Sequence, residues 1–251
     1  MEEQKLIEYS GTKTQSKIFK YIQYFLIVFI YFTLLNGFTT PTKTIKEKKC
    51  KSSVRFGNST ICLPEIDGMK ESYKKPELKS YADSMIGNQN KILGFYLNNS
   101  TYNSLKSSNN FQFDDYMILL GPTNLQKHDI TTKAEFESLL NGLTNYYDKN
   151  SEKINQKALL KLKRLTNIIS LGKFVLFEQY SLNSKIKSFV LLTKIQTNDE
   201  ETVQVGIANV VWIRKKMIFL NYYRTYEGIE SIKTTKAKND YMVLQFYNEN
   251  N

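Results

Sequence analysis

An apolar segment from Tyr21 to Phe38 (YIQYFLIVFIYFTLLNGF) constrains this chain more than any other feature. It contains no charged residue, and three lysines precede it within residues 13–20. Its most apolar part, Tyr24–Leu35, has the length of a signal-peptide core, whereas the complete segment is just long enough to span a bilayer as a helix. If Gly37 is the last residue removed by cleavage, Leu35 occupies the −3 position, where a smaller residue is preferred. The segment therefore predicts an uncleaved signal anchor, with a cleaved signal peptide as the alternative.

The distribution of charge divides the chain further. Of the net charge of +11, residues 1–38 carry +1 and residues 39–55 carry +5, so the remaining 196 residues carry only +5. We therefore predict a basic tail (1–20), the anchor or signal peptide (21–38), a basic spacer (39–52) and one α+β domain (53–251). A nucleic-acid partner is not expected, because binding one requires a basic face on the folded domain.

The basic residues that follow the apolar segment favour attraction to anionic lipid headgroups. The candidates for lipid-surface contact are Lys43, Lys46, Lys48, Lys49, Lys51 and Arg55. The alternative is a solvated, disordered spacer, which is how blocks of like charge usually behave.

Two signals disagree about the side of the membrane on which the domain lies. The positive-inside rule places the domain in the cytoplasm, because more basic residues follow the segment than precede it. However, Cys50 and Cys62 flank a predicted hairpin, and two cysteines at this spacing favour a disulfide in an oxidising compartment. Large domains are translocated largely regardless of charge. We therefore predict a membrane-anchored protein of the cell envelope whose domain is periplasmic or extracellular, or secreted if the segment is cleaved.

Local patterns predict the elements of the first part of the domain. Gly57-Asn58 between two β-rich runs is a hairpin signal, and Thr132 with Glu135 forms a capping box at a helix start. The predicted order is a hairpin (Ser53–Phe56 and Thr60–Leu63), a helix (Glu77–Met85), two strands (Lys91–Leu97 and Phe113–Leu120) separated by a polar turn (Asn98–Tyr102), and two helices, one beginning after Thr132 and one ending near Asn167.

The last third of the chain changes to a β pattern. Four β-rich runs with short connections predict an antiparallel meander: Lys173–Leu182, Ile186–Gln196, Thr202–Ile213 and Met217–Arg224. A helix over Glu227–Asn248 follows. The expected fold is therefore α+β, with an antiparallel sheet packed by helices and preceded by one apolar helix.

The hairpin VVWIRKKMIFLNYY (Val210–Tyr223), followed by YEGIESI (Tyr226–Ile232), resembles the PsbP-like α/β/α sandwich family. The resemblance covers about the C-terminal two thirds of the chain. It implies a sheet between helical layers and a role in binding or assembly, and it transfers no catalytic residue.

The residues that usually carry catalysis form no recognisable constellation. His128 is the one histidine in the sequence and lies in a polar connection. Asp114 and Asp115 adjoin a strand start, where successive side chains face opposite ways. We therefore expect no catalytic residue, cofactor or metal ligand.

Aromatic and basic residues near the end of the meander are candidates for an exposed interaction patch, because Tyr, Trp and Arg dominate interface hot spots. They are Trp212, Tyr222, Tyr223, Arg224 and Tyr226. Their alternative role is packing under the helices. The expected function is a non-enzymatic binding or assembly domain with a protein partner and a membrane contact through residues 21–38. The alternative is an envelope hydrolase that uses carboxylates and lysines in a cleft.

Overall fold

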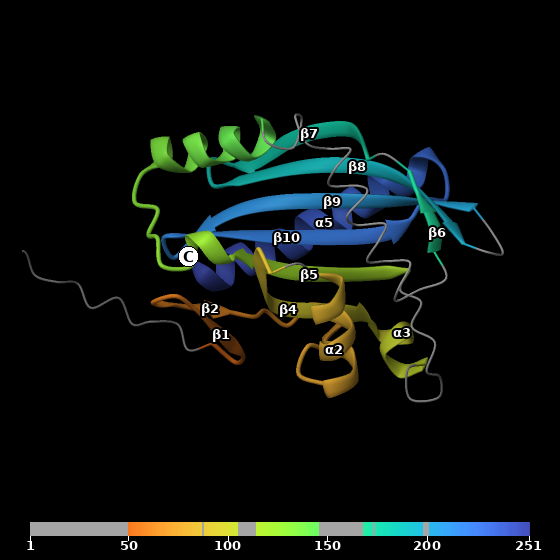
Figure 1. Ribbon diagram of the computed structural model, residues 1–251, viewed down its shortest axis with the longest axis horizontal. Coiled ribbons are helices and arrows are strands. Elements are labelled where there is room, and N and C mark those ends of the chain that lie inside the picture. Colours follow the sequence, from red (N-terminus) through yellow and green to blue (C-terminus); the bar gives the residue numbers. More distant parts are fainter. Residues whose placement is uncertain (1–49, 87, 105–113, 146–167, 173, 198–200) are drawn as a thin grey trace, which may run out of the picture. The chain divides into compact units, whose positions relative to one another are not determined.

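The computed structural model describes residues 50–251 except 87, 105–113, 146–167, 173 and 198–200 (Figure 1). The predicted basic tail, the apolar helix over 21–38, most of the spacer and the second predicted helix lie outside these described residues. Among the described residues, no helix is both long and apolar enough to cross a membrane.

Eight strands of the described residues form one antiparallel sheet in the order β3-β4-β5-β10-β9-β8-β6, with β7 also paired to β8. The strands are β3 (Met69–Glu71), β4 (Asn90–Asn98), β5 (Asp115–Pro122), β6 (Ile168–Leu171), β7 (Val175–Asn183), β8 (Ile186–Thr197), β9 (Glu201–Ile213) and β10 (Lys216–Thr225). The predicted meander is confirmed, since β7, β8, β9 and β10 pair in sequence. The register of β10 with β5, from Phe219↔Leu120 to Arg224↔Asp115, joins the meander to the earlier strands.

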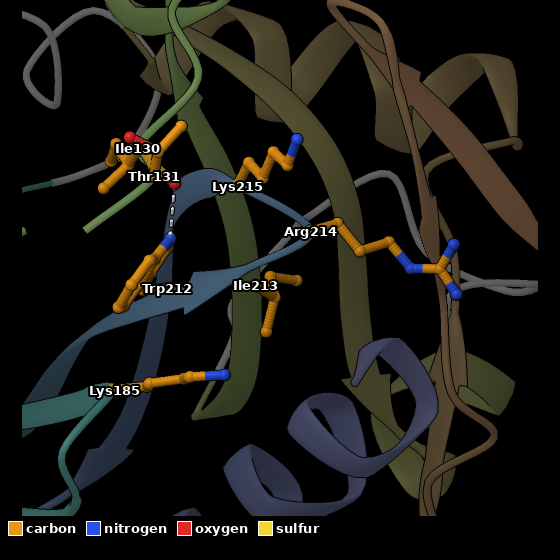
Figure 2. Close-up of a pocket in the computed structure, with 7 residues that line it drawn as sticks. All are labelled: Ile130, Thr131, Lys185, Trp212, Ile213, Arg214 and Lys215. Atoms are coloured by element: carbon orange, nitrogen blue, oxygen red, sulfur yellow. Dashed lines mark hydrogen bonds between the residues drawn. The ribbon is translucent and has the colours of Figure 1, made fainter. Parts of the chain in front are cut away.

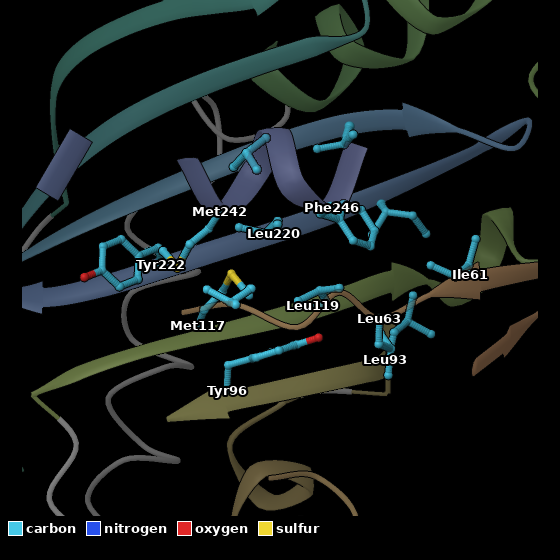
Figure 3. Packing of buried hydrophobic residues seen from close by; sticks show 14 of the residues in the cluster. Ile61, Leu63, Leu93, Tyr96, Met117, Leu119, Leu220, Tyr222, Met242 and Phe246 are labelled. Atoms are coloured by element: carbon cyan, nitrogen blue, oxygen red, sulfur yellow. The ribbon is translucent and has the colours of Figure 1, made fainter. Parts of the chain in front are cut away.

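Helices cover both faces of this sheet. The long helix α5 (Ile229–Asn250) buries Met242, Val243 and Phe246 against one face, where Leu119 and Leu220 also lie (Figure 3). The neighbouring β5 residues Ile118 and Leu120 point the other way, because strand side chains alternate. They pack with Leu78 and Ala82 of the helix α2 (Pro76–Met85).

A further helix, over residues 133–145, covers the same face as α2, farther along the sheet. Its Phe136 is buried with Val210 and Met217. The described residues thus form an antiparallel sheet with helices on both sides, as the α+β prediction required.

The hairpin of β1 (Ser53–Phe56) and β2 (Ser59–Cys62) forms a separate two-stranded sheet. Its turn begins at Gly57, which has a positive φ of 61°. A Cβ atom there would lie 1.9 Å from the Gln126 carbonyl oxygen, so close backbone contact and left-handed geometry both require glycine. Phe56 and Ile61 enter the main core, so the hairpin is fixed to the rest of the domain.

Two local predictions require correction. The segment predicted as a polar turn over Asn98–Tyr102 contains the short helix α3 (Asn99–Ser104). The side chain of Asn98 accepts a hydrogen bond from the Thr101 amide at 2.7 Å, so it caps this helix as asparagine commonly does. The last helix begins at Ile229 rather than Glu227, because Gly228 has a positive φ of 98° that helical geometry excludes.

Candidate functional site

The tight turn between β9 and β10 is made of two cationic residues, Arg214 and Lys215. Their φ angles are 43° and 62°, in the left-handed region that side chains with a Cβ atom rarely adopt. Two-residue hairpin turns with this backbone normally carry Asn-Gly or similar pairs. The left-handed conformation costs each of these residues about 1–2 kcal/mol relative to ordinary backbone geometry. The chain nevertheless carries two basic side chains in this turn.

Neighbouring segments hold this turn in place. The Ser59 hydroxyl donates to the Arg214 carbonyl at 2.9 Å, and the Ile130 amide donates to the Lys215 carbonyl at 2.8 Å. The Arg214 guanidinium lies 3.7 Å from the sulfur of Cys62. Segments near residues 59, 130 and 214 thus meet at one end of the sheet.

The turn borders a pocket of about 420 Å³ (Figure 2). Its lining consists of Ile130, Thr131, Lys185 and the run Trp212–Lys215. This volume falls within the range of small-ligand sites in proteins. Lys185 comes from the neighbouring turn between β7 and β8, so two adjacent hairpin turns supply the cations.

Trp212, the sole tryptophan of the chain, forms a fixed wall of the pocket. Its indole N–H donates to the Ile130 carbonyl at 3.1 Å, which the dashed line in Figure 2 marks. The opposing ring of Phe136 stacks on it with a centroid distance of 5.7 Å. The ammonium group of Lys185 lies 5.5 Å from the ring centroid, within cation–π range. The indole is therefore held by one hydrogen bond and contacts on two sides.

The charges that line the pocket are all positive. Within the described part of the chain, Lys185, Arg214 and Lys215 form no ion pair, and Arg214 Nε is buried without a hydrogen-bond partner. The lining residues include no carboxylate. The arrangement therefore suits an anionic group that presents oxygen atoms.

Asp129, an acidic side chain next to the lining residue Ile130 in sequence, is already engaged. The fully buried ammonium of Lys216 donates to Asp129 Oδ1 at 2.6 Å and to the carbonyls of Gln126 and His128. The hydrogen bond from Lys216, followed by one from Asn58, holds the pKa of the Asp129 carboxyl below its usual value. These bonds fix the loop beside the pocket, and Asp129 forms its ion pair with Lys216 rather than with a lining cation.

His128 and the capping box lie on the outer side of the same loop. The ring Nε2 of His128 is 2.6 Å from Glu135 Oε1, and the Thr131 amide donates to Glu135 Oε2 at 2.9 Å. The hydrogen bond from the Thr131 amide, and secondarily the one with His128, lowers the pKa of the Glu135 carboxyl. The Glu135 amide in turn bonds the Thr132 hydroxyl at 3.2 Å, so the predicted helix start is present.

The five residues of the predicted interaction patch do not share one surface. Trp212 lines the pocket, whereas Tyr222 is fully buried on the face under α5. Tyr223 stacks on Tyr116 with a centroid distance of 4.9 Å, opposite Gly206 on β9. Gly206 lies six positions before Trp212 on β9, which corresponds to about 20 Å.

The remaining two patch residues lie near the end of β10. Arg224 is 3.8 Å from Glu227, and the partly buried ring of Tyr226 packs beside Ile232. The structure thus places Trp212 in one pocket with Lys185, Arg214 and Lys215. None of these three cations belongs to the predicted interaction patch. The sequence does contain one signal for this site: the predicted hairpin turn has the pair Arg214-Lys215 where glycine or asparagine is usual.

Asp115, which the sequence places at a strand start, forms an ion pair. Its Oδ2 atom lies 2.8 Å from the Lys238 ammonium of α5, and its side chain is 18% exposed. Burial, with the nearby charge of Asp115, raises the pKa of the Tyr222 hydroxyl. Asp115 therefore ties the sheet to α5. Among the described residues, no group of three or more His, Cys, Asp or Glu side chains could hold a metal ion.

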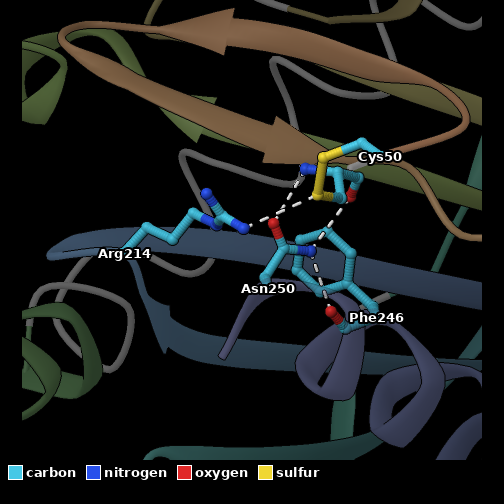
Figure 4. The surroundings of a disulfide bond; sticks show 5 residues. Cys50, Arg214, Phe246 and Asn250 are labelled. Carbon is cyan, nitrogen blue, oxygen red and sulfur yellow. Dashed lines mark hydrogen bonds between the residues drawn. A yellow bond between two sulfur atoms is a disulfide. The ribbon is translucent and has the colours of Figure 1, made fainter. Parts of the chain in front are cut away.

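The predicted disulfide between Cys50 and Cys62 is present, with a Cα–Cα distance of 5.4 Å (Figure 4). It agrees with a non-cytoplasmic location, since such bonds persist mainly in oxidising compartments. Of the predicted lipid-contact residues, the structure describes two: Lys51, which lies 2.6 Å from Glu65, and the exposed Arg55. Those at 43, 46, 48 and 49 lie outside the described residues.

Comparison with protein-family models, curated proteins and solved structures finds no match to the chain. The fold and the site define the class of this protein. It is an α+β domain whose first hairpin carries a disulfide and which has a cationic pocket at the β9–β10 turn.

Proposed function

We propose that this chain is a non-enzymatic binding domain of the cell envelope, exported or held at the membrane by residues 21–38, and that the pocket beside Trp212 is its binding site. The β9–β10 turn carries this proposal. Arg214 and Lys215 occupy left-handed backbone positions and form no ion pair among the described residues.

Strain of this kind clusters at functional sites, because folding alone would favour Asn-Gly in such a turn. Basic side chains that stabilised the fold would have carboxylate partners, as Lys216 has in Asp129. Arg214 and Lys215 instead border an open volume next to a fixed indole. A ligand with a negative group and a flat apolar part would satisfy both features.

The alternative, an envelope hydrolase with carboxylates and lysines in a cleft, is less well supported. General acid–base catalysis needs a titratable group within reach of the reacting atoms. The lining provides Lys185 and Lys215 but no carboxylate, and the nearby Asp129 is occupied by Lys216 and Asn58. The lining therefore offers groups that hold an anion.

The layering supports the further proposal that the domain is PsbP-like. An antiparallel sheet with helices on both faces is what that family's α/β/α sandwich requires, and the Val210–Tyr223 hairpin occupies its centre. A role as a binding or assembly module follows from this proposal.

The location can be tested in intact cells through the two cysteines. A membrane-impermeant maleimide should label the chain only after an impermeant reductant has opened the Cys50–Cys62 bond. Labelling that also requires permeabilisation would place the domain in the cytoplasm and contradict the proposed location.

The binding function can be tested by site-specific photo-crosslinking of the full chain in its own membrane. A photoreactive residue at Thr131 lies in the pocket lining and leaves all three cations in place. The matched control carries the same group at Lys233, an exposed position on the first turns of α5. A product of one defined mass should form at 131 and not at 233.

The same experiment in an Arg214→Asn/Lys215→Gly background tests whether the turn is responsible. These residues suit the turn, so the fold should be kept while both charges are removed. Loss of the product would support the proposal. Equal products at 131 and 233, or a product unchanged by the double substitution, would refute it.

A further inference from the structure

The cationic pocket lies where the chain enters the domain. Cys50, the first described residue, is bonded to Cys62, whose sulfur is 3.7 Å from the Arg214 guanidinium. Ser59, in the same hairpin, holds the Arg214 carbonyl. The start of the domain and the β9–β10 turn are therefore neighbours through direct contacts.

The sequence limits how far this end can lie from the apolar segment. Eleven residues, 39–49, separate Phe38 from Cys50. Fully extended, this connection spans at most about 40 Å. If residues 21–38 are a membrane anchor, as proposed above, Cys50 and the adjoining turn stay within that distance of the bilayer surface.

The residues at this end are of the kinds that favour a membrane surface. In the sequence, the basic run over residues 43–55 leads into this end of the domain. The folded domain adds Lys185 and Lys215, and also Arg214, whose side chain Figure 2 shows extending away from Trp212. Tryptophan beside basic residues is the combination enriched at the headgroup level of bilayers.

We propose that the pocket beside Trp212 binds the phosphate of an anionic lipid headgroup in the membrane that carries the apolar segment. Arg and Lys donors match phosphate oxygens, and Lys185 and Lys215 line the pocket without an ion pair among the described residues. In this orientation the partly exposed indole of Trp212 meets the apolar edge of the headgroup region, while Ile130 stays buried behind it. This inference rests on the proposed binding function and adds the ligand and the docked orientation.

The test uses the full chain reconstituted into vesicles with the same lipid mixture in both leaflets, so either insertion direction gives the same result. Trp212, as the sole tryptophan, reports on the pocket directly. Its fluorescence is measured with lipids that carry a quencher on the headgroup. Quenching should be strong in phosphatidylcholine vesicles containing about 30% phosphatidylglycerol, weak in phosphatidylcholine alone, and reduced at about 0.5 M salt.

Arg214→Asn/Lys215→Gly should lower the equilibrium constant for docking about 25-fold, because each basic residue near an anionic surface strengthens attachment about fivefold. Lys70→Gln/Lys233→Gln removes the same charge from two exposed positions away from the turn and should behave as wild type. Quenching equal in both lipid mixtures, or insensitive to the turn substitutions, would overturn the inference.

Inorganic phosphate separates a lipid from a soluble ligand. In neutral vesicles it should leave the Trp212 spectrum unchanged at millimolar concentration. A saturable response to phosphate with no response to anionic lipid would overturn the lipid assignment while leaving the binding function intact. Failure of the Thr131 crosslink would remove the binding function itself, so the two failures are distinguishable.

Discussion

The side chain of Asn250 pairs with the backbone of Cys62 through two hydrogen bonds, as a neighbouring strand would (Figure 4). Asn250 Oδ1 accepts from the Cys62 amide at 2.8 Å, and Nδ2 donates to the Cys62 carbonyl at 3.0 Å. Nδ2 also donates to the Phe246 carbonyl, so the amide joins the last turn of α5 to β2. Residues 188 positions apart thus fix the disulfide hairpin.

Asn250→Ala should lower the free energy of unfolding by about 2–4 kcal/mol, because it leaves the buried amide and carbonyl of Cys62 unpaired. Urea denaturation of the full chain measures this change. The exposed Asn248 supplies the matched control, and its substitution by alanine should cost no more than about 0.5 kcal/mol. Equal effects at the two positions would show that the Asn250 bonds do not hold the hairpin.

Local signals explain what could be predicted of this fold. The alternation of apolar residues and the short connections predict the meander, and Gly57-Asn58 predicts the first hairpin. The capping box at Thr132 marks a helix start. Each signal lies within a few residues, where backbone geometry and side-chain type act directly on each other.

The candidate site could not be predicted in the same way. Ile130, Lys185 and Arg214 meet because β9 pairs with both β8 and β10, and because the Ile130 amide donates to the Lys215 carbonyl in the turn. These contacts depend on long-range register, which no local pattern contains. The alternation of β10 placed one of Tyr222 and Tyr223 in the core, but without the position of α5 it could not say which.

The β9–β10 turn should become more stable when its charges are removed. Arg214→Asn/Lys215→Gly relieves two left-handed positions and should raise the free energy of unfolding by about 1–3 kcal/mol. The same variant is expected to lose ligand binding, so stability and function would change in opposite directions. Urea denaturation gives the first quantity and the Trp212 measurement the second. Destabilisation by this variant would mean that Arg214 and Lys215 serve the fold rather than a ligand.

The amides of Asn209 and Asn239 form a reciprocal buried pair between β9 and α5. Asn209 Nδ2 donates to Asn239 Oδ1 at 2.8 Å, and Asn239 Nδ2 donates back at 3.1 Å. Asn239→Leu should cost about 2–3 kcal/mol, because one N–H of the buried Asn209 amide loses its acceptor. The Leu220 carbonyl and the Ser188 hydroxyl still bond that amide. Asn209→Leu/Asn239→Leu should cost less than the sum of the single changes, with a coupling of about 1 kcal/mol or more.

A double-mutant cycle by urea denaturation measures this coupling. Asn209→Leu combined with the exposed Asn248→Leu provides the control cycle, in which the two effects should add. Additivity in both cycles would show that the amide pair contributes no shared energy.

The bond between Asp129 and Lys216 should make stability depend on pH in the acidic range. The Lys216 ammonium lowers the pKa of Asp129 in the folded chain, so the unfolded chain binds the proton more readily. The stabilisation is therefore complete above the usual Asp pKa of 3.8 and is lost as pH falls below it. Asp129→Asn should reduce stability at neutral pH, and its difference from wild type should shrink as the pH is lowered through this range.

Urea denaturation of both chains between neutral pH and the lowest pH at which the wild type stays folded measures this dependence. The exposed Asp67 provides the matched control through Asp67→Asn. Trp212 gives a second readout, because Lys216 holds the loop that ends at Ile130 and the Ile130 carbonyl accepts the indole N–H. Its emission should shift in Asp129→Asn at neutral pH and converge with the wild type in acid. A difference from wild type that stays constant across the range would show that Asp129 acts on the loop without its charge.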